Sequence, residues 1–150
     1  QEDETAVLGL SKVQRIQEYE IGITIMEDVQ RNIRRIDREF IKTVKTEMVN
    51  CNILEVETGT NGYHGGDTGH GGRAIVRLSD AASTDMRCNI LGDIEGSIQT
   101  YEVHFSHVDF VEIVVGGDAE IETLIDSLEF VVKNLKEQIK NKGEWPKNIQ

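Results

Sequence analysis

A glycine-rich stretch between residues 59 and 72 holds most of the side chains in this sequence that could do chemistry. It reads Gly-Thr-Asn-Gly-Tyr-His-Gly-Gly-Asp-Thr-Gly-His-Gly-Gly and contains seven of the 14 glycines and two of the four histidines of the chain. Ordering glycine costs more entropy than ordering any other residue, and two to five residues are enough to join two strands. We therefore expect the stretch to do more than connect its neighbours.

The residue types in this stretch favour a small anionic, nucleotide-like ligand. Backbone amides of glycine-rich loops form concavities that bind anions. Tyr63 offers a face for stacking, His64 and His70 offer hydrogen-bond donors, and Arg73 could bind a phosphate in a bidentate manner. A flexible, exposed tip built from turn-forming residues is the structural alternative. The predicted ligand-binding residues are Tyr63, His64, Gly65, Gly66, Asp67, Thr68, His70, Gly71, Gly72 and Arg73.

A metal site is a second hypothesis for the same stretch. His64, Asp67 and His70 have the spacing H-x2-D-x2-H. Two imidazoles and a carboxylate suit Zn²⁺ or a non-haem metal, and an open fourth position could activate water for hydrolysis. His104 and His107 are further candidate ligands. Because no metallohydrolase signature is complete, the metal stays an open alternative, and we expect no cofactor.

Other catalytic signatures are missing from the sequence. Cys51 and Cys88 have no C-x2-C partner, which argues against structural zinc and favours two buried, reduced thiols. Neither a G-x-S-x-G elbow nor a G-x-x-x-x-G-K-[ST] loop occurs. These observations favour a protein that is not an enzyme.

Charge and hydropathy argue against two classes of partner. Lysine plus arginine number 16 and aspartate plus glutamate 27, which gives a net charge of −11. Phosphate affinity comes mainly from lysine and arginine, so a broad nucleic-acid-binding surface is not expected. No apolar run reaches the roughly 18 residues that a membrane span needs, so no membrane partner is expected either.

The N-terminal third of the chain predicts a long helix that brings copies together. Between Leu10 and Met48 apolar residues recur about every 3.5 positions, which is the period of a coiled coil. We predict a helix over 12–49, a helical oligomerisation segment over 1–50, and a homo-oligomer formed through it. A helical hairpin broken near Gly22 is the alternative. We interpret four arginines on this segment as a solvated face: Arg31, Arg34, Arg35 and Arg38.

Residues 51–143 predict an α+β domain that carries the glycine-rich loop. An amphipathic helix is expected from Asp118 to about Gly143, with Asp118 as its N-cap. It would pack on an antiparallel sheet of about five strands, and 144–150 would form a tail. The predicted strands are 54–58, 74–78, 86–90, 98–105 and 109–115.

Two stretches of this domain resemble small proteins of phages and prophages. They run from Leu54 through Arg73 and from Val114 to Glu120, with Gly-Tyr-His-Gly-Gly-Asp-Thr-Gly-His-Gly-Gly-Arg as the specific part. The resemblance covers about residues 52–135. It implies an accessory, anti-defence protein in the host bacterial cytoplasm, since several such proteins sequester nucleotide-derived immune signals in pockets of oligomers.

Three functional hypotheses follow from the sequence. The first is a non-catalytic oligomeric protein that holds a nucleotide-like anion through its glycine-rich loop. The second is a phage-encoded inhibitor that acts through protein–protein interaction. The third is a metal-dependent hydrolase that uses His64, Asp67 and His70.

Overall fold

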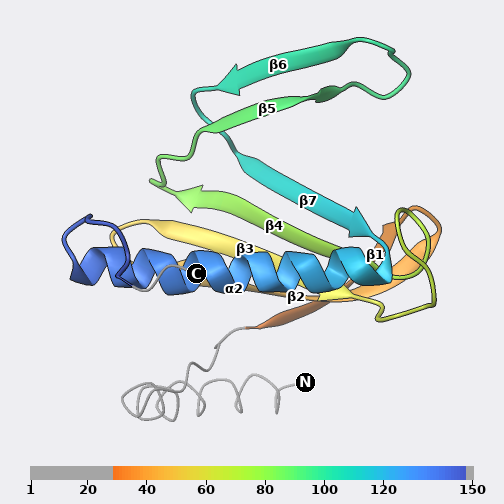
Figure 1. Cartoon of the computed structure of the whole chain (residues 1–150), viewed down its shortest axis with the longest axis horizontal. Coiled ribbons are helices and arrows are strands. Elements are labelled where there is room, and N and C mark those ends of the chain that lie inside the picture. Colours follow the sequence, from red (N-terminus) through yellow and green to blue (C-terminus); the bar gives the residue numbers. More distant parts are fainter. Residues whose placement is uncertain (1–28, 148–150) are drawn as a thin grey trace. The chain divides into compact units, whose positions relative to one another are not determined.

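The computed structural model of the chain describes residues 29–147. Within this range the chain forms seven strands followed by a helix, α2 (Figure 1). The elements are β1 (Gln30–Ile36), β2 (Glu39–Val49), β3 (Ile53–Thr60), β4 (Arg73–Ala82), β5 (Cys88–Asp93), β6 (Thr100–Phe105), β7 (Phe110–Gly116) and α2 (Asp118–Lys140).

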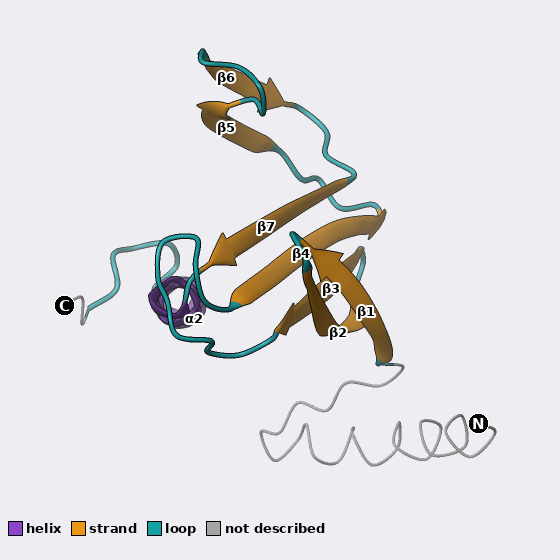
Figure 2. Cartoon of the chain, turned by 90° about the vertical axis from the view of Figure 1, so that its right-hand side faces the viewer, coloured by secondary structure: helices purple, strands orange, loops and turns teal. Residues whose placement is uncertain are grey.

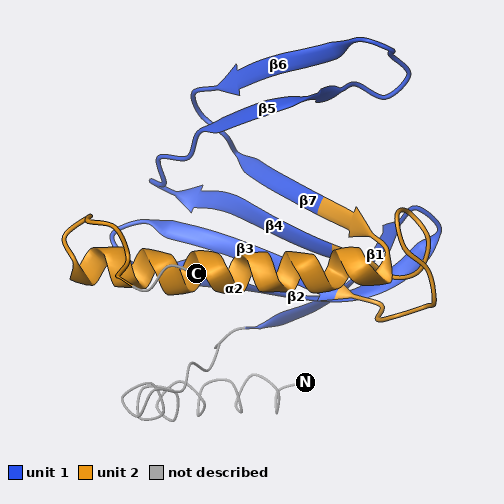
Figure 3. Ribbon diagram, viewed as in Figure 1, with its two compact units in different colours: residues 1–59, 75–113 blue, residues 60–74, 114–150 orange. Residues whose placement is uncertain are grey.

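The described part of the chain divides into two compact units, which Figure 3 shows in different colours. The first unit contains residues 29–59 and 75–113, and therefore most of the strands. The second contains residues 60–74 and 114–147, which include most of the glycine-rich loop, the end of β7, and α2. The loop and α2 thus belong to one unit although they are far apart in the sequence.

The strands in the described residues form two sheets. The larger has the order β1-β2-β3-β4-β7, and the smaller consists of β5 and β6. β2 pairs in antiparallel fashion with both β1 and β3. β5 and β6 are also antiparallel, with Cys88 opposite Phe105 at one end and Asp93 opposite Thr100 at the other. The β5–β6 hairpin therefore has a ladder of its own.

The register of the larger sheet gathers polar side chains on one face. Arg34 lies opposite Ile41, and Thr43 lies opposite Gly59. Directly opposed residues, and residues two apart along a strand, share a face of a sheet. Arg34, Thr43 and Glu57 therefore lie on the same face of three successive strands.

The predicted N-terminal helix is wrong over the part that the structure describes, because residues 30–49 form the hairpin of β1 and β2. Apart from Ile36, the described apolar residues that fit the helical period lie outside the buried set. Phe40 and Val44 are 68% and 40% exposed, whereas Ile41, outside that series, is fully buried. The segment is rich in β-branched residues, which pack well on a pleated surface. The part of the predicted helix over 12–28 lies outside the described residues.

The predicted fold class is corrected accordingly. The described chain is mostly antiparallel β-sheet, in two sheets, with a single helix at its C-terminal end (Figure 1). An α+β fold with a long N-terminal helix does not fit this architecture. α2 begins at Asp118, one residue earlier than an Asp118 N-cap would place it, since Gly117 is the N-cap.

The buried core of the first unit is small. Ile41 and Ile75 are fully buried, and Ile36 completes their cluster. Two polar residues, Thr43 and Glu57, are nearly as inaccessible, at 2% and 4% exposed. A buried carboxylate needs a partner, because taking an unpaired charge out of water is costly. The first unit therefore depends on polar contacts as well as on apolar packing.

Candidate functional site

The glycine-rich loop is ordered around the first turn of α2 (Figure 2). The carboxylate of Asp118 accepts hydrogen bonds from the backbone amides of His64 at 3.0 Å, Gly65 at 2.7 Å and Gly72 at 2.9 Å. Successive backbone amides that converge in this way form an anion-binding nest. The loop thus has the nest that its composition predicts, and a carboxylate of the same chain fills it.

These amides change the acidity of Asp118. The hydrogen bonds from Gly72 and His64, and then those from Gly65 and Gly66, lower its pKa from 3.8 to about 2 by stabilising the ionised form. Partial desolvation opposes the shift and is outweighed. Asp118 is therefore ionised throughout the neutral range, which makes it a strong acceptor for the loop.

Further contacts tie the loop to the helix terminus. Asp67 accepts a hydrogen bond from the amide of Ala119 at 2.9 Å, and Glu120 accepts one from the amide of Thr68. The amide of Asp118 donates to the carbonyl of Gly66 at 2.7 Å. The first turn of a helix leaves amides without intrahelical partners. The loop supplies partners for these amides. It thereby caps the helix, because the N-cap residue Gly117 has no side chain that could do so.

Arg73 also binds the loop from within. Its guanidinium donates to the carbonyl oxygens of Gly69, Gly71 and Gly72 at 2.9 to 3.2 Å. Its backbone amide donates to the side-chain oxygen of Asn61 at 2.7 Å. The guanidinium that we predicted to bind phosphate therefore stabilises the path of the loop.

Two of the glycines are required by this packing. Gly71 has φ +93°, a conformation that residues with a side chain rarely adopt. A Cβ atom on Gly72 would overlap the carbonyl oxygen of Gly62. Close approach of the backbone to itself thus explains part of the glycine content of the loop without a ligand.

The exposed side chains of the loop lie in acidic surroundings. Tyr63 is 61% exposed, and its hydroxyl donates to Glu122 at 2.8 Å, which raises the pKa of the tyrosine. The ring of His64 contacts the carbonyl of Asn61, and His70 is exposed. An incoming anion would meet the charges of Glu122 and Asp118. Binding of a nucleotide-like anion by these residues stays a prediction, and the charges here oppose it.

The structure does not assemble the candidate metal ligands. Among residues 29–147, no group of three or more His, Cys, Asp or Glu side chains is placed to hold a metal ion. Asp67 is engaged by the amide of Ala119, and His64 contacts Asn61. The H-x2-D-x2-H spacing therefore does not translate into a shared site.

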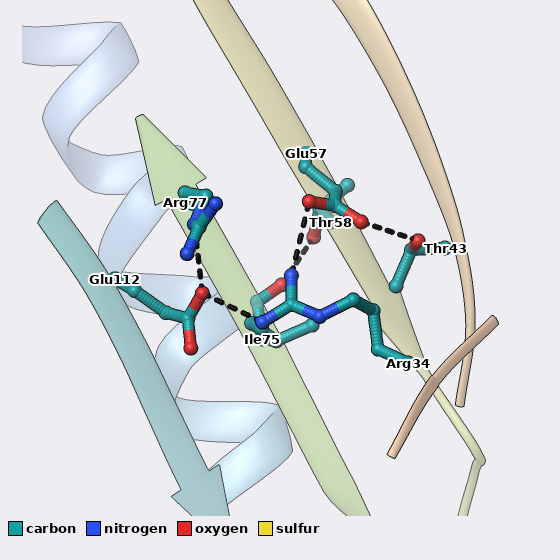
Figure 4. Close-up of polar contacts among 7 residues, drawn as sticks. All are labelled: Arg34, Thr43, Glu57, Thr58, Ile75, Arg77 and Glu112. Carbon is teal, nitrogen blue, oxygen red and sulfur yellow. Dashed lines mark hydrogen bonds and ion pairs between the residues drawn. The ribbon is translucent and has the colours of Figure 1, made fainter. Parts of the chain in front are cut away.

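A network of charged side chains, which no sequence pattern predicts, lies in the first unit (Figure 4). Arg34 donates to Glu57 at 3.0 Å and to Glu112 at 2.8 Å, and Arg77 donates to the same oxygen of Glu112 at 2.8 Å. The hydroxyl of Thr43 donates to the other oxygen of Glu57 at 2.7 Å. Two guanidinium groups, from β1 and β4, thus neutralise two carboxylates, from β3 and β7.

The network also determines the protonation of Glu112. Burial alone would raise the pKa of this carboxyl, but the hydrogen bonds and charges of Arg34 and Arg77 outweigh burial and lower it. Glu112 therefore stays ionised and paired. The prediction that Arg34 belongs to a solvated helix face is wrong, because Arg34 lies in β1. Recognition of the β1 strand would have placed it on the face of the sheet that it occupies.

A pocket of about 430 Å³ lies within the first unit, between the base of the β5–β6 hairpin and β7. Phe110 forms part of the pocket wall, and the guanidinium of Arg77 lies over its ring, 3.8 Å from the ring centroid. On the rim, His107 lies 3.4 Å from Asp109. The pocket is lined by Cys88, Ile90, Phe105, His107, Val108, Asp109, Phe110, Val111 and Glu112.

The two cysteines occupy different environments. Both are free; Cys88 is half-buried in the wall of this pocket, and Cys51 is exposed. The prediction of two buried thiols is therefore wrong for Cys51, which follows the end of β2 in a turn.

Comparison with known proteins adds no identification. No protein-family model, curated protein or solved structure matches the chain. None of the helices in the described residues is both long and apolar enough to span a bilayer. The function must therefore be argued from the chemistry of the sites.

Proposed function

We propose that the protein is a non-catalytic binding protein that takes a small, flat, uncharged molecule into the pocket of the first unit. The observation that carries the proposal is the pocket itself. Its volume of about 430 Å³ falls within the roughly 300–1,000 Å³ of small-molecule sites. It also combines apolar walls with a few polar groups, which is the usual composition of such sites.

The aromatic residues of the pocket favour a flat ligand. Phe105 and Phe110 are 46% and 49% exposed, so each leaves ring surface available for contact. Stacked or edge-to-face aromatic contacts contribute about 0.5–1.5 kcal/mol beyond the area that they bury. The thiol of Cys88 and the imidazole of His107 supply polar contacts at the edge.

Charge favours an uncharged ligand over an anion. Glu112 reaches the pocket wall with its charge already balanced by Arg34 and Arg77. Asp109 adds a negative charge beside His107. A phosphate would therefore find no unpaired cation among these lining residues. This ligand class differs from the anion expected from the sequence because the site differs.

The two cysteines provide a direct test of the pocket. We expect the uncharged dye Nile red to bind the full chain and to slow alkylation of Cys88 by iodoacetamide, because the bound dye covers that thiol. Alkylation of the exposed Cys51 should be unchanged and serves as the internal control. Mass spectrometry of the two cysteine-containing peptides measures both rates. Dye binding without protection of Cys88 would overturn the proposal.

A matched pair of variants tests the aromatic wall. Phe105→Ala is expected to weaken dye binding about tenfold, the upper end of an aromatic contact. Phe40→Ala removes an exposed phenylalanine that does not line this pocket, and it should leave binding unchanged. Equal affinities of the two variants would contradict the assignment. Because Phe105 is half-exposed, its loss should leave the chain folded.

A different measurement distinguishes nucleotide binding at the glycine-rich loop from ligand binding in the pocket. A nucleotide bound only to the native state would raise the thermal midpoint. If the loop binds it, Arg73→Ala should abolish that increase, and Cys88 should stay unprotected. The pocket proposal expects no protection of Cys88 by any nucleotide.

A further inference from the structure

α2 carries an apolar stripe that is largely exposed. At about 100° per residue, all of its large apolar side chains except Phe130 fall within one face about 120° wide. Only Ile121, at the start of the stripe, is buried among the residues of α2. The remaining stripe extends to Ile139, about 27 Å along the helix from Ile121. Its exposed members are Ile125 at 48%, Leu128 at 42%, Val131 at 46%, Val132 at 51%, Leu135 at 56% and Ile139 at 77%.

An exposed apolar stripe of this length marks an interaction surface, because burial of such side chains is favourable. The spacing of this stripe indicates the partner. Along the centre of the stripe, from Ile121 to Ile139, successive apolar residues are 4, 3, 4, 3 and 4 positions apart. These steps read the same in both directions. A second copy of α2 that runs the opposite way therefore places Ile125 opposite Leu135 and Leu128 opposite Val132, as a two-fold interface requires.

The charges of α2 select the antiparallel direction. Residues 118–129 contain five acidic side chains and no basic one, whereas residues 130–140 contain three lysines and one glutamate. An antiparallel pair sets the acidic half of each helix against the basic half of the other. A parallel pair would set like charges against each other, which is unfavourable.

The charges that flank the stripe fit the same arrangement. Glu122 and Glu129 lie on the same flank as Lys136 and Lys140, at about 80° to 120° from Leu128 around the helix. In a two-fold antiparallel pair, each flank faces the same flank of the other copy. The glutamates of one helix therefore face the lysines of its partner.

We infer that α2 is a dimerisation helix that packs antiparallel against α2 of a second copy of this chain. The two-fold axis crosses the stripe between Leu128 and Val132. This surface differs from the helical segment that the sequence favoured for oligomerisation. It also does not depend on the small-molecule pocket, since all residues that line the pocket precede α2.

Two matched substitutions on the full chain test the stripe. Sedimentation equilibrium should show a dimer for the wild type and a monomer for Leu128→Asp, which places a carboxylate beside the axis. Phe130→Asp is the control, because Phe130 is 55% exposed and lies about 160° around the helix from Leu128. It should stay dimeric. A monomeric wild type, or a dimeric Leu128→Asp variant, would overturn the inference. Since Leu128 is already exposed, circular dichroism should show both variants folded.

Disulfide formation tests the direction of the helices. In a background with Cys51→Ser and Cys88→Ala, we introduce Ile125→Cys in one preparation and Leu135→Cys in another. An antiparallel pair yields a mixed disulfide when the two are combined and little disulfide in either alone. A parallel pair yields the reverse, because each new thiol then faces its own copy. Self-linked dimers of Ile125→Cys would therefore overturn the antiparallel arrangement.

Discussion

Arg34→Met is expected to lower the free energy of unfolding by about 3 kcal/mol, because it leaves the Glu57 carboxylate buried without its cation. Glu57 is 4% exposed, and Arg34 lies 3.0 Å from it. The estimate is at the lower end of the range for a buried pair because the Arg34 side chain is 26% exposed. Methionine keeps much of the apolar stem. Urea denaturation, with the midpoint and slope fitted together, measures the change.

The second carboxylate of the network makes the experiment specific. Glu112 keeps Arg77 when Arg34 is lost, so the effect should come from Glu57. The double variant Arg34→Met/Glu57→Leu should therefore be more stable than Arg34→Met alone, because no buried charge is left unpaired. Arg87→Met is the control, since the ion pair of Arg87 with Asp85 is about 70% exposed on both sides. It should leave the midpoint unchanged. An equal loss in Arg34→Met and Arg87→Met would refute the role of burial.

The β1–β2 hairpin shows where sequence periodicity fails. Ile33, Phe40 and Val44 recur at helical spacing, yet they are exposed in the structure. In β2 the buried residues Ile41 and Thr43 instead alternate with exposed residues, at the period of two that is typical of a strand. Neither residue belongs to the helical series. A buried threonine beside a buried carboxylate does not register in a pattern built from apolar residues alone. The periodicity of the apolar residues therefore does not reveal the β1–β2 hairpin.

Later strands were easier to locate because their apolar residues alternate clearly. The predicted segments at 54–58 and 74–78 lie within β3 and β4, and the helix that was expected after Gly117 is α2. Local alternation and turn-forming residues are sufficient to place such elements. They do not reveal which charged side chains on different strands pair with one another, as Arg34 pairs with Glu57 and Glu112 across the sheet.

The site illustrates the same limit of sequence analysis. The loop was expected between two strands, and it joins β3 to β4. Its glycine amides do converge, but on Asp118, a residue far along the chain that we interpreted as a helix cap. The pocket is assembled from β5, β6, β7 and the connection between β6 and β7, with no motif in common, so no spacing could have shown it. Contacts between distant segments decide both sites.

Acidification is expected to weaken the contact of the glycine-rich loop with α2 below pH 3.8 and to release the loop near pH 2. Because the pKa of Asp118 is lowered from 3.8 to about 2, its ionised form contributes stability above pH 3.8. That contribution is lost as the pH falls through about 2, where the folded form binds its proton. The amide protons of His64, Gly65 and Gly72 should therefore shift together in NMR spectra, with a common midpoint near 2. A midpoint near 3.8 would show that the amides do not hold the carboxylate.

Substitution of Asp118 should reproduce this release at neutral pH. In Asp118→Ala the amides of His64, Gly65 and Gly72 lose their acceptor, so their hydrogen exchange should accelerate markedly and the thermal midpoint should fall. Asp118→Asn keeps one acceptor oxygen without the charge, and it should give an intermediate result. Asp126→Asn removes an acidic charge two turns further along the same helix and should alter neither measurement. Protected loop amides in Asp118→Ala would mean that the glycines, rather than the carboxylate, hold the loop in place.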